Sequence, residues 1–105
     1  MIYVENKKRY SGNGFYIGRP SVLGNPYTHL KGKTLAKFTV ETRQESIDKY
    51  REYFDEQMKT SPLFADRVNL IKQKSKIEDV HLICWCRPFS CHGDIIKEYL
   101  EKTNE

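Results

Sequence analysis

The sequence has no long apolar run, no secretory start and too few cysteines for a disulfide framework. No stretch of about 18 apolar residues occurs, so we expect no membrane-spanning helix. The first residues lack the basic start and apolar core of a signal peptide, which favours a cytoplasmic protein. The three cysteines are an odd number, and two of them are separated by one residue. Reduced thiols or metal ligands therefore fit better than disulfides.

The composition fits one small and very soluble domain. The chain has 105 residues, enough for a single compact core over residues 1–105. Lysine and arginine outnumber aspartate and glutamate by 18 to 14, which gives a net charge of +4. A basic balance suits polyanionic partners, because phosphate contacts release counterions. Most of the lysines are scattered on polar helix faces among acidic residues, so an ordinary solvated surface explains the charge equally well.

The order of apolar patterns predicts an α/β domain with about three strands and with helices packed on the sheet. Short apolar runs predict strands at residues 2–4, 15–17 and 80–84. Capping residues followed by apolar stripes predict three helices: from the capping box at Thr42 to about Met58, from Ser61-Pro62 to the basic end at residues 72–76, and from Ser90 to about Lys102. Residues 29–40 fit either a β-hairpin or an irregular excursion with Phe38 and Val40 reaching the core.

Residues 84–94 hold all three cysteines, the only tryptophan and one of three histidines. They lie where a strand pattern gives way to a helical one, at Arg87-Pro88, because proline has no N–H for a sheet ladder. Cys91 and His92 are then expected in the first helical turn, where free N–H groups favour anions and lower the pKa of a thiol. Ligands of open α/β sheets bind outside the carboxyl ends of the strands. We therefore predict a functional site in this stretch.

A second stretch, residues 18–27, contains two glycines, two prolines, an asparagine, a serine and an arginine, which predicts an irregular loop. Such a loop exposes backbone N–H groups, and the guanidinium of Arg19 could clamp a phosphate or carboxylate. The pattern matches neither the P-loop nor the dinucleotide-binding fingerprint. A rigid turn whose arginine pairs with a protein carboxylate is the alternative interpretation.

Together the two stretches resemble a known family. Gly-Arg-Pro-Ser and Gly-Asn-Pro stand at residues 18–21 and 24–26, and Cys-Trp-Cys, Pro and Cys-His-Gly-Asp follow within residues 84–94. These paired motifs resemble the domain of unknown function family numbered four-three-two-six over nearly the whole chain. The resemblance implies a bacteriophage or bacterial protein that acts in the host cytoplasm, and it brings no established activity. The sequence departs from the family mainly at residues 30–41, which look like an added excursion.

The first functional hypothesis is a site for a small anionic molecule, such as a nucleotide or nucleobase derivative, with or without thiol-based catalysis. Cys91 would be the nucleophile or redox thiol, His92 the general acid–base group, and Asp94 the group that orients a partner or the substrate. The expected ligand-binding residues come from the loop and from one cysteine: Gly18, Arg19, Ser21, Gly24, Asn25 and Cys86. Cys84 fits either a resolving thiol or a small apolar core residue.

Two alternatives stay open, and the sequence names no cofactor. Cys84, Cys86, Cys91 and His92 supply the three thiolates and one imidazole of a structural zinc site, although their spacing is tighter than zinc sites usually have. The other alternative is a basic module that binds nucleic acid or a host protein without catalysis. Seven tyrosines offer stacking surface for it, but no recognised nucleic-acid motif is present.

Overall fold

The computed structural model describes residues 1–19, 21–28, 38–85 and 91–103. Within these ranges the α/β class predicted from the sequence is confirmed. The elements follow one another as β1 (Ile2–Asn6), β2 (Phe15–Tyr16), β3 (Tyr27–Thr28), β4 (Phe38–Thr39), α1 (Arg43–Thr60), α2 (Pro62–Ser75), β5 (Val80–Cys84) and α3 (His92–Thr103). The described helices include none that is long and apolar enough to cross a membrane.

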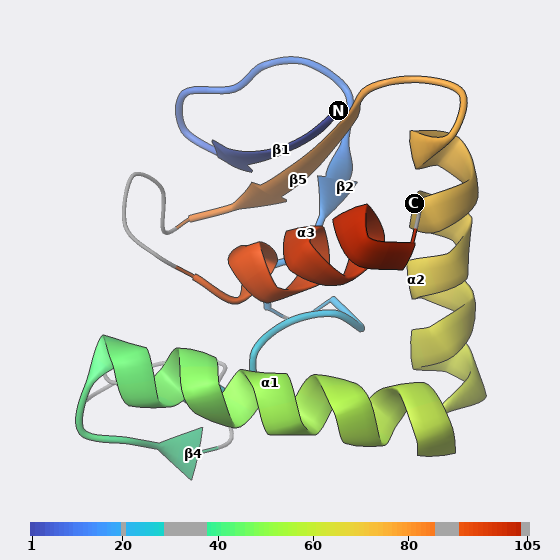
Figure 1. The fold of residues 1–105 in the computed structure, drawn as a ribbon. Coiled ribbons are helices and arrows are strands. Elements are labelled where there is room, and N and C mark those ends of the chain that lie inside the picture. Colours follow the sequence, from blue (N-terminus) through green and yellow to red (C-terminus); the bar gives the residue numbers. More distant parts are fainter. Residues whose placement is uncertain (20, 29–37, 86–90, 104–105) are drawn as a thin grey trace.

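The main sheet has the order β1-β5-β2, and both neighbouring pairs are parallel (Figure 1). Asn6 at the end of β1 lies beside Cys84 at the end of β5, and Tyr16 of β2 lies beside Ile83. Because the strands are parallel, their carboxyl ends meet at one edge of the sheet. The two sequence motifs follow directly after β2 and β5, so both begin at this edge.

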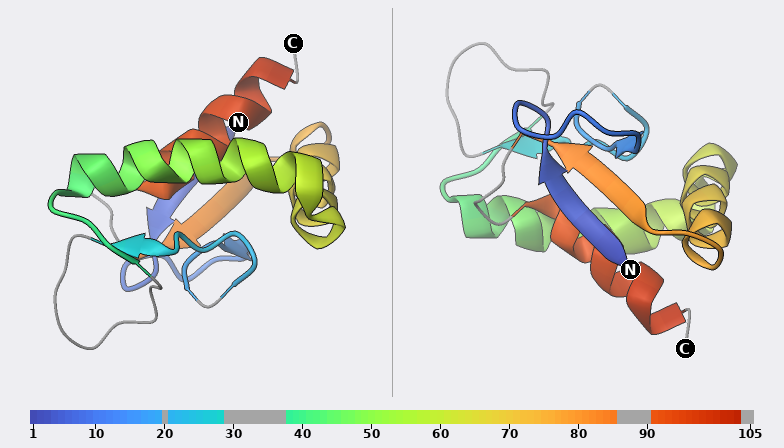
Figure 2. Two further views of the ribbon diagram at one scale, coloured as in Figure 1. Left: turned by 90° about the horizontal axis from the view of Figure 1, so that it is seen from below. Right: turned by 90° about the horizontal axis from the view of Figure 1, so that it is seen from above.

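The helices cover one face of the sheet. Figure 1 shows α3 directly beneath the strands, α1 below α3, and α2 upright at the side. Val80, Leu82 and Cys84 are buried, whereas His81 and Ile83 between them are half-buried, as expected when alternate side chains of β5 point to opposite faces. Seen from above, the strands lie in front of the helices (Figure 2). No described helix covers the face that carries His81.

Local capping explains where two of the helices begin. The Thr42 hydroxyl accepts a hydrogen bond from the Glu45 N–H at 3.0 Å, and α1 starts at the next residue. The Ser61 hydroxyl accepts from the Phe64 N–H at 3.3 Å, and Pro62 occupies the first position of α2. Both starts agree with the sequence prediction. Ser90, predicted to cap the last helix, lies outside the described residues, and α3 begins at His92.

The core lies between the sheet and the helices, and its largest fully buried side chains come from α1, α2, α3, the loop and the strands: Tyr50, Phe54, Phe64, Ile71, Ile96, Leu100, Leu23, Ile17 and Leu82. One expectation about the core is wrong. Phe38 is 54% exposed, because its ring stacks on the ring of Tyr27 at 5.1 Å rather than on the core. Its strand β4 pairs with β3 in parallel, which is not the pairing of a β-hairpin.

Candidate functional site

The end of β5 and the start of α3 bring two thiols together. The sulfurs of Cys84 and Cys91 lie 3.3 Å apart, and both residues carry thiols that are not joined in a disulfide. The two residues are only 1% and 3% exposed and belong to the hydrophobic core. Cys84 is therefore a core residue, as one of our two interpretations had it. We call Cys84, Cys91 and His92 the cysteine corner.

Cys91 stands immediately before α3 and stabilises its first turn. Its sulfur accepts a hydrogen bond from the Gly93 N–H at 3.3 Å, and its own N–H donates to the Asp94 carboxylate at 3.2 Å. This reciprocal arrangement is that of a capping box, with a thiol in place of the usual hydroxyl. A Cβ on Gly93 would lie 2.9 Å from the Cδ1 atom of Ile17 and 3.0 Å from the Cγ1 atom of Val4. The glycine thus lets the start of α3 approach the sheet closely.

His92 joins the two sequence motifs. Its Nε2 atom lies 2.6 Å from the carbonyl oxygen of Ile17, and because a carbonyl can only accept, Nε2 carries the proton. Burial lowers the pKa of His92 below its usual value, and the charge of Arg19 acts in the same direction. The hydrogen bond to Ile17, together with Cys84 and Asp94, opposes this shift without reversing it. His92 is therefore a neutral donor that ties α3 to the strand leading into the loop.

The side chains of Arg19 and Asn25 hold the loop of residues 18–27 in shape. The guanidinium of Arg19 donates to the carbonyl oxygens of Asn25 at 2.8 Å and Tyr27 at 3.3 Å. The side chain of Asn25 donates to the Ser46 hydroxyl at 2.9 Å and accepts from the Tyr27 N–H at 2.9 Å. The Tyr50 hydroxyl adds a bond to the carbonyl oxygen of Leu23 at 2.7 Å. These contacts fasten the loop to itself and to α1.

Two consecutive turns shape the middle of the loop. The Ser21 N–H donates to the carbonyl oxygen of Gly18, and the Gly24 N–H donates to that of Ser21, both at 2.9 Å. A Cβ on Gly24 would lie 3.0 Å from the Ser21 carbonyl oxygen and 3.1 Å from the Cα atom of Arg19, so the turn leaves no room for a side chain. The Ser21 hydroxyl differs from its neighbours. It is buried, and it has no hydrogen-bond partner among the described residues.

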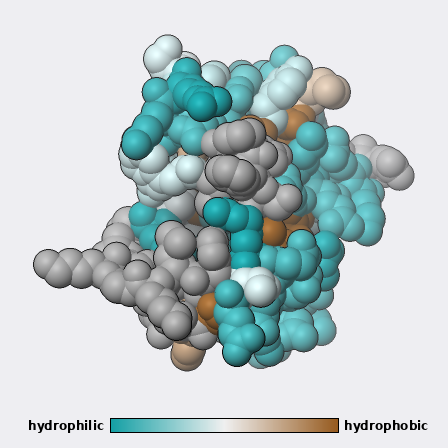
Figure 3. Space-filling model, turned by 90° about the vertical axis from the view of Figure 1, so that its left-hand side faces the viewer, coloured by the Kyte–Doolittle hydropathy of each residue, from teal (hydrophilic) through white to brown (hydrophobic). Residues whose placement is uncertain are grey.

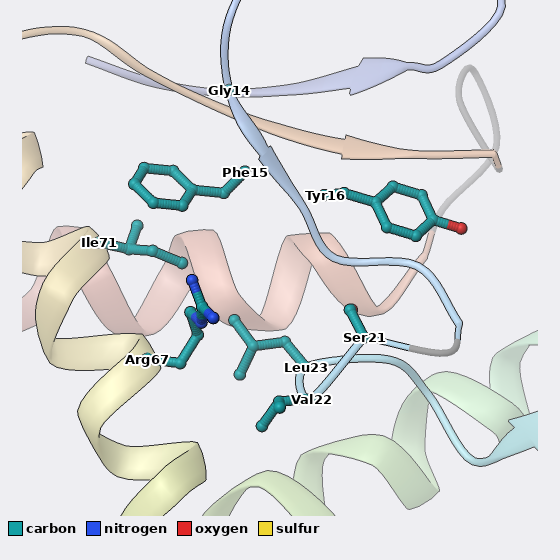
Figure 4. Close-up of a pocket in the computed structure, with 8 residues that line it drawn as sticks. All are labelled: Gly14, Phe15, Tyr16, Ser21, Val22, Leu23, Arg67 and Ile71. Carbon is teal, nitrogen blue, oxygen red and sulfur yellow. The ribbon is translucent and has the colours of Figure 1, made fainter.

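Ser21 lines a pocket between β2, the loop and α2, with a volume of about 460 Å³. The wall residues come from these three segments: Gly14, Phe15, Tyr16, Ser21, Val22, Leu23, Arg67 and Ile71. Figure 4 shows the side chain of Arg67 reaching from α2 into the space between Phe15, Leu23 and Ile71. We call this space the α2 pocket.

Two polar side-chain groups of the α2 pocket have no partner among the described residues. In the part of the chain that the structure describes, Arg67 makes no hydrogen bond or ion pair, and neither does the Ser21 hydroxyl. Phe15, Val22, Leu23 and Ile71 supply apolar wall around them. The exposed cation of Arg67 and the buried Ser21 hydroxyl, beside apolar side chains, match an anionic ligand that also has an apolar part.

A metal centre is not formed by the described residues. No three of their histidines, cysteines, aspartates and glutamates come together in a way that could hold a metal ion, and this includes Cys84, Cys91 and His92. Cys86 lies outside the described ranges. The four-ligand zinc hypothesis therefore stays a prediction.

Residues 2–102 match the sequence model of a family described as Domain of unknown function (DUF4326). The chain belongs to this family. A comparison with curated proteins found no match, and neither did a comparison with solved structures. Membership confirms the resemblance carried by the paired motifs. Because the description of DUF4326 names no activity, the chemistry of this domain has to be argued from its own residues.

In this DUF4326 domain the two motif segments lie side by side, because His92 bonds the carbonyl oxygen of Ile17, the residue that precedes Gly18. Ser21 is the predicted ligand-binding residue that lines the α2 pocket, whereas Gly18, Arg19, Gly24 and Asn25 shape the loop. The catalytic roles predicted for Cys91, His92 and Asp94 stay predictions.

The sequence analysis missed Arg67 and Phe15 as site residues. Arg67 sits one turn before Ile71 on α2, beside the apolar stripe of that helix, where a long cationic side chain is ordinarily read as solvated surface. Phe15 belongs to a short apolar run that the sequence analysis predicted only as a strand. The sequence signal for Arg67 was a single cation at the border of the apolar stripe of α2. It indicates a binding site only when the segment that faces α2 is known.

Proposed function

We propose that this protein binds a small anionic molecule, a nucleotide or nucleobase derivative, in the α2 pocket. Arg67 pairs with the phosphate or another anionic group, the Ser21 hydroxyl forms a hydrogen bond with the ligand, and the ring of Phe15 packs against the base. The phage or bacterial origin and the cytoplasmic location implied by the family resemblance belong to the same proposal.

The observation that carries the proposal is the Ser21 hydroxyl, buried with no partner in the described ranges. Leaving a buried polar group unpaired costs about 1–3 kcal/mol, and folded proteins rarely keep such groups without a reason. A ligand oxygen or nitrogen in the α2 pocket would supply the missing bond. The hydroxyl thus supports a binding role better than a purely structural one.

The charge and size of the pocket support the same conclusion. The guanidinium of Arg67 engages no other described residue, so it is available for a bidentate contact with a phosphate or carboxylate. The volume of about 460 Å³ falls within the range of roughly 300–1,000 Å³ typical of small-molecule sites. The surrounding apolar wall suits the flat ring of a base better than it suits a bare inorganic ion.

Binding without chemistry is the form of the proposal that the geometry favours. The two described thiols pack in the core, and neither lines the α2 pocket. His92 holds its proton on the atom that bonds Ile17, which commits that nitrogen to a structural contact. Thiol-based catalysis, as predicted from the motif, is therefore left out of the proposed function.

The test is calorimetric titration of the protein with a purine and a pyrimidine nucleoside monophosphate, the matching nucleosides and inorganic phosphate. We expect saturable binding of a monophosphate and at least about tenfold weaker binding of its nucleoside, because charge-assisted bonds contribute about 1.5–3 kcal/mol. Arg67→Gln should weaken the monophosphate by a similar factor, and Ser21→Ala by a smaller one.

Arg51→Gln is the matched control for Arg67→Gln. Arg51 is an exposed arginine on α1 that pairs with Glu98 at 3.1 Å, so the substitution removes the same charge away from the pocket. It should leave the titration unchanged. Wild-type affinity in Arg67→Gln would refute the pocket assignment, and so would binding that is lost in Cys91→Ser alone. A melting temperature for every variant shows that it is folded.

A further inference from the structure

The uncovered face of the sheet carries a row of rings. Tyr3, His81 and Tyr16 occupy alternate positions on β1, β5 and β2 that point away from the helices, as the register Tyr3↔His81 and Tyr16↔Ile83 requires. The ring of His81 stacks on Tyr3 at 5.0 Å and on Tyr10 at 4.7 Å. Aromatic surface therefore extends across this face. We call it the open face.

Trp85 extends this row at the carboxyl edge. It follows β5 directly, it is 50% exposed, and its indole N–H donates to the Tyr16 hydroxyl at 3.0 Å. Its carbonyl oxygen accepts a hydrogen bond from the Asn6 side chain at 3.2 Å. The only tryptophan of the chain is thus held in a fixed position with half of its surface in solvent.

Three consecutive cations follow β1, and the first of them lies beside these rings. The ammonium group of Lys7 is 5.4 Å from the ring centre of Tyr16 and 5.8 Å from that of Trp85, and the Lys7 N–H donates to the Cys84 carbonyl oxygen at 2.8 Å. Lys8 and Arg9 follow, and all three cations are exposed. The loop after β1 is therefore anchored next to the end of β5, with the charge of Lys7 at the rim of the aromatic row.

We propose that the open face binds single-stranded nucleic acid, with bases stacked on Trp85 and Tyr3 and phosphates bound by Lys7, Lys8 and Arg9. Exposed rings beside cations are the combination that single-strand binders use, because every base has a face to stack and every linkage has a charge. A duplex keeps its bases stacked inside and has none to offer these rings. The partner is thus an unpaired strand.

Charge and hydropathy favour a polyanion over a protein partner. Glu5 also lies on the open face, where its carboxylate lies 2.8 Å from the Nδ1 atom of His81. Figure 3 views the carboxyl edge of the sheet, where β1 and β5 end, rather than the open face itself, and the described residues on this side are mainly hydrophilic with only small apolar patches. A docking surface for a protein would present a larger apolar centre.

The open face is distinct from the α2 pocket. Tyr16 borders both, but Figure 4 shows its ring pointing away from Arg67 and Phe15. Arg67 lies on α2, and the three cations follow β1. The nucleic-acid proposal therefore goes beyond the proposed function, and either can fail without the other.

Trp85 makes the test direct, because its fluorescence comes from the proposed contact. Titration with a 12-nucleotide oligothymidylate should quench the emission, and a hairpin duplex of the same length should bind at least about fivefold more weakly. The affinity should fall with salt, with a log–log slope of about −2 if three cations meet phosphates, since each contributes roughly −0.7. Equal affinity for the duplex would overturn the proposal.

Two variants separate stacking from general charge attraction, with binding followed by the anisotropy of a labelled oligothymidylate. Trp85→Leu should weaken binding by about fivefold or more, and Lys7→Gln/Lys8→Gln/Arg9→Gln should in addition flatten the salt dependence. The control Lys49→Gln/Lys59→Gln/Lys74→Gln removes the same charge from exposed positions on α1 and α2 and should leave binding within about twofold. Equal losses in the two triple variants, or wild-type binding by Trp85→Leu, would overturn the proposal.

Arg67→Gln distinguishes this proposal from the previous one. It should leave oligothymidylate binding unchanged while it weakens the monophosphate. The triple substitution at Lys7, Lys8 and Arg9 should do the reverse. If Arg67→Gln weakened the oligonucleotide as much as the triple variant does, the strand would occupy the α2 pocket and the open-face assignment would be wrong.

Discussion

The cysteine corner and the α2 pocket both border the loop of residues 18–27, but they differ in whether their polar side chains are hydrogen-bonded within the protein. At the corner His92 bonds the Ile17 carbonyl, and in the adjoining loop Arg19 bonds two carbonyls. In the α2 pocket the Ser21 hydroxyl and the Arg67 guanidinium have no partner among the described residues. The polar side chains of the cysteine corner and the adjoining loop therefore stabilise the fold. Those of Ser21 and Arg67 in the α2 pocket remain available to bind a ligand.

The largest expected effect is on the rate at which the buried thiols of the cysteine corner react with a thiol reagent. In a Cys86→Ser variant the remaining thiols are Cys84 and Cys91, both in the core. They should react with an aromatic disulfide reagent at least about a thousandfold more slowly than in urea-unfolded protein, because exposure requires unfolding. The measurement is the absorbance change of the released thiolate. Rapid reaction of one equivalent in the native state would show that the corner opens and would revive the catalytic role of Cys91.

The next effect is on stability within the loop. Asn25→Ala removes a buried amide and leaves the Ser46 hydroxyl and the Tyr27 N–H each without one partner. We expect a loss of about 2–3 kcal/mol in the free energy of unfolding, measured by urea denaturation. Asn69→Ala, at an exposed position of α2, is the control and should change stability by less than about 0.5 kcal/mol. Equal effects of the two substitutions would contradict the fastening role of Asn25.

A third difference depends on pH. The pKa of His92 is lowered in the folded state by burial, so the unfolded chain binds this proton more readily. The stability that His92 contributes is fully present above about pH 6.5 and declines as the pH falls below it, by up to about 1.4 kcal/mol per pH unit until the folded-state pKa is reached. Urea denaturation of wild type and His92→Gln between pH 5 and about pH 8 checks this. The variant should show a flatter curve, and parallel curves would rule out the effect.

The smallest effect has the opposite sign. Ser21→Ala deletes a buried hydroxyl without a described partner, so the free energy of unfolding should stay constant or rise by up to about 1 kcal/mol. Ser46→Ala deletes a hydroxyl that bonds Asn25 and donates to the Tyr27 carbonyl at 2.8 Å, and it should lower stability by about 1–2 kcal/mol. The same chemical change thus tests both regions. A loss in Ser21→Ala as large as that in Ser46→Ala would mean that Ser21 has a partner after all.

Local signals determined the elements. The hydroxyls of Thr42 and Ser61 cap helices where the sequence placed them, because capping depends on residues three apart. The apolar run at β5 marked a strand for the same local reason. Phe38 was misplaced because a hydrophobic residue in an unpatterned segment looks like core until its neighbour, here Tyr27, is known.

The position of the cysteine corner could be predicted from the sequence alone, because the motif spans the carboxyl end of a predicted strand and the start of the helix that follows it. Tertiary structure decided what their side chains do. Whether Arg19 binds an anion or two carbonyls depends on the path of the loop, and whether Cys91 is accessible depends on how closely Gly93 lets α3 approach the sheet. Bringing Ser21 and Arg67 to one pocket required α2 to lie opposite β2 and the loop, an arrangement of distant segments that no local pattern encodes.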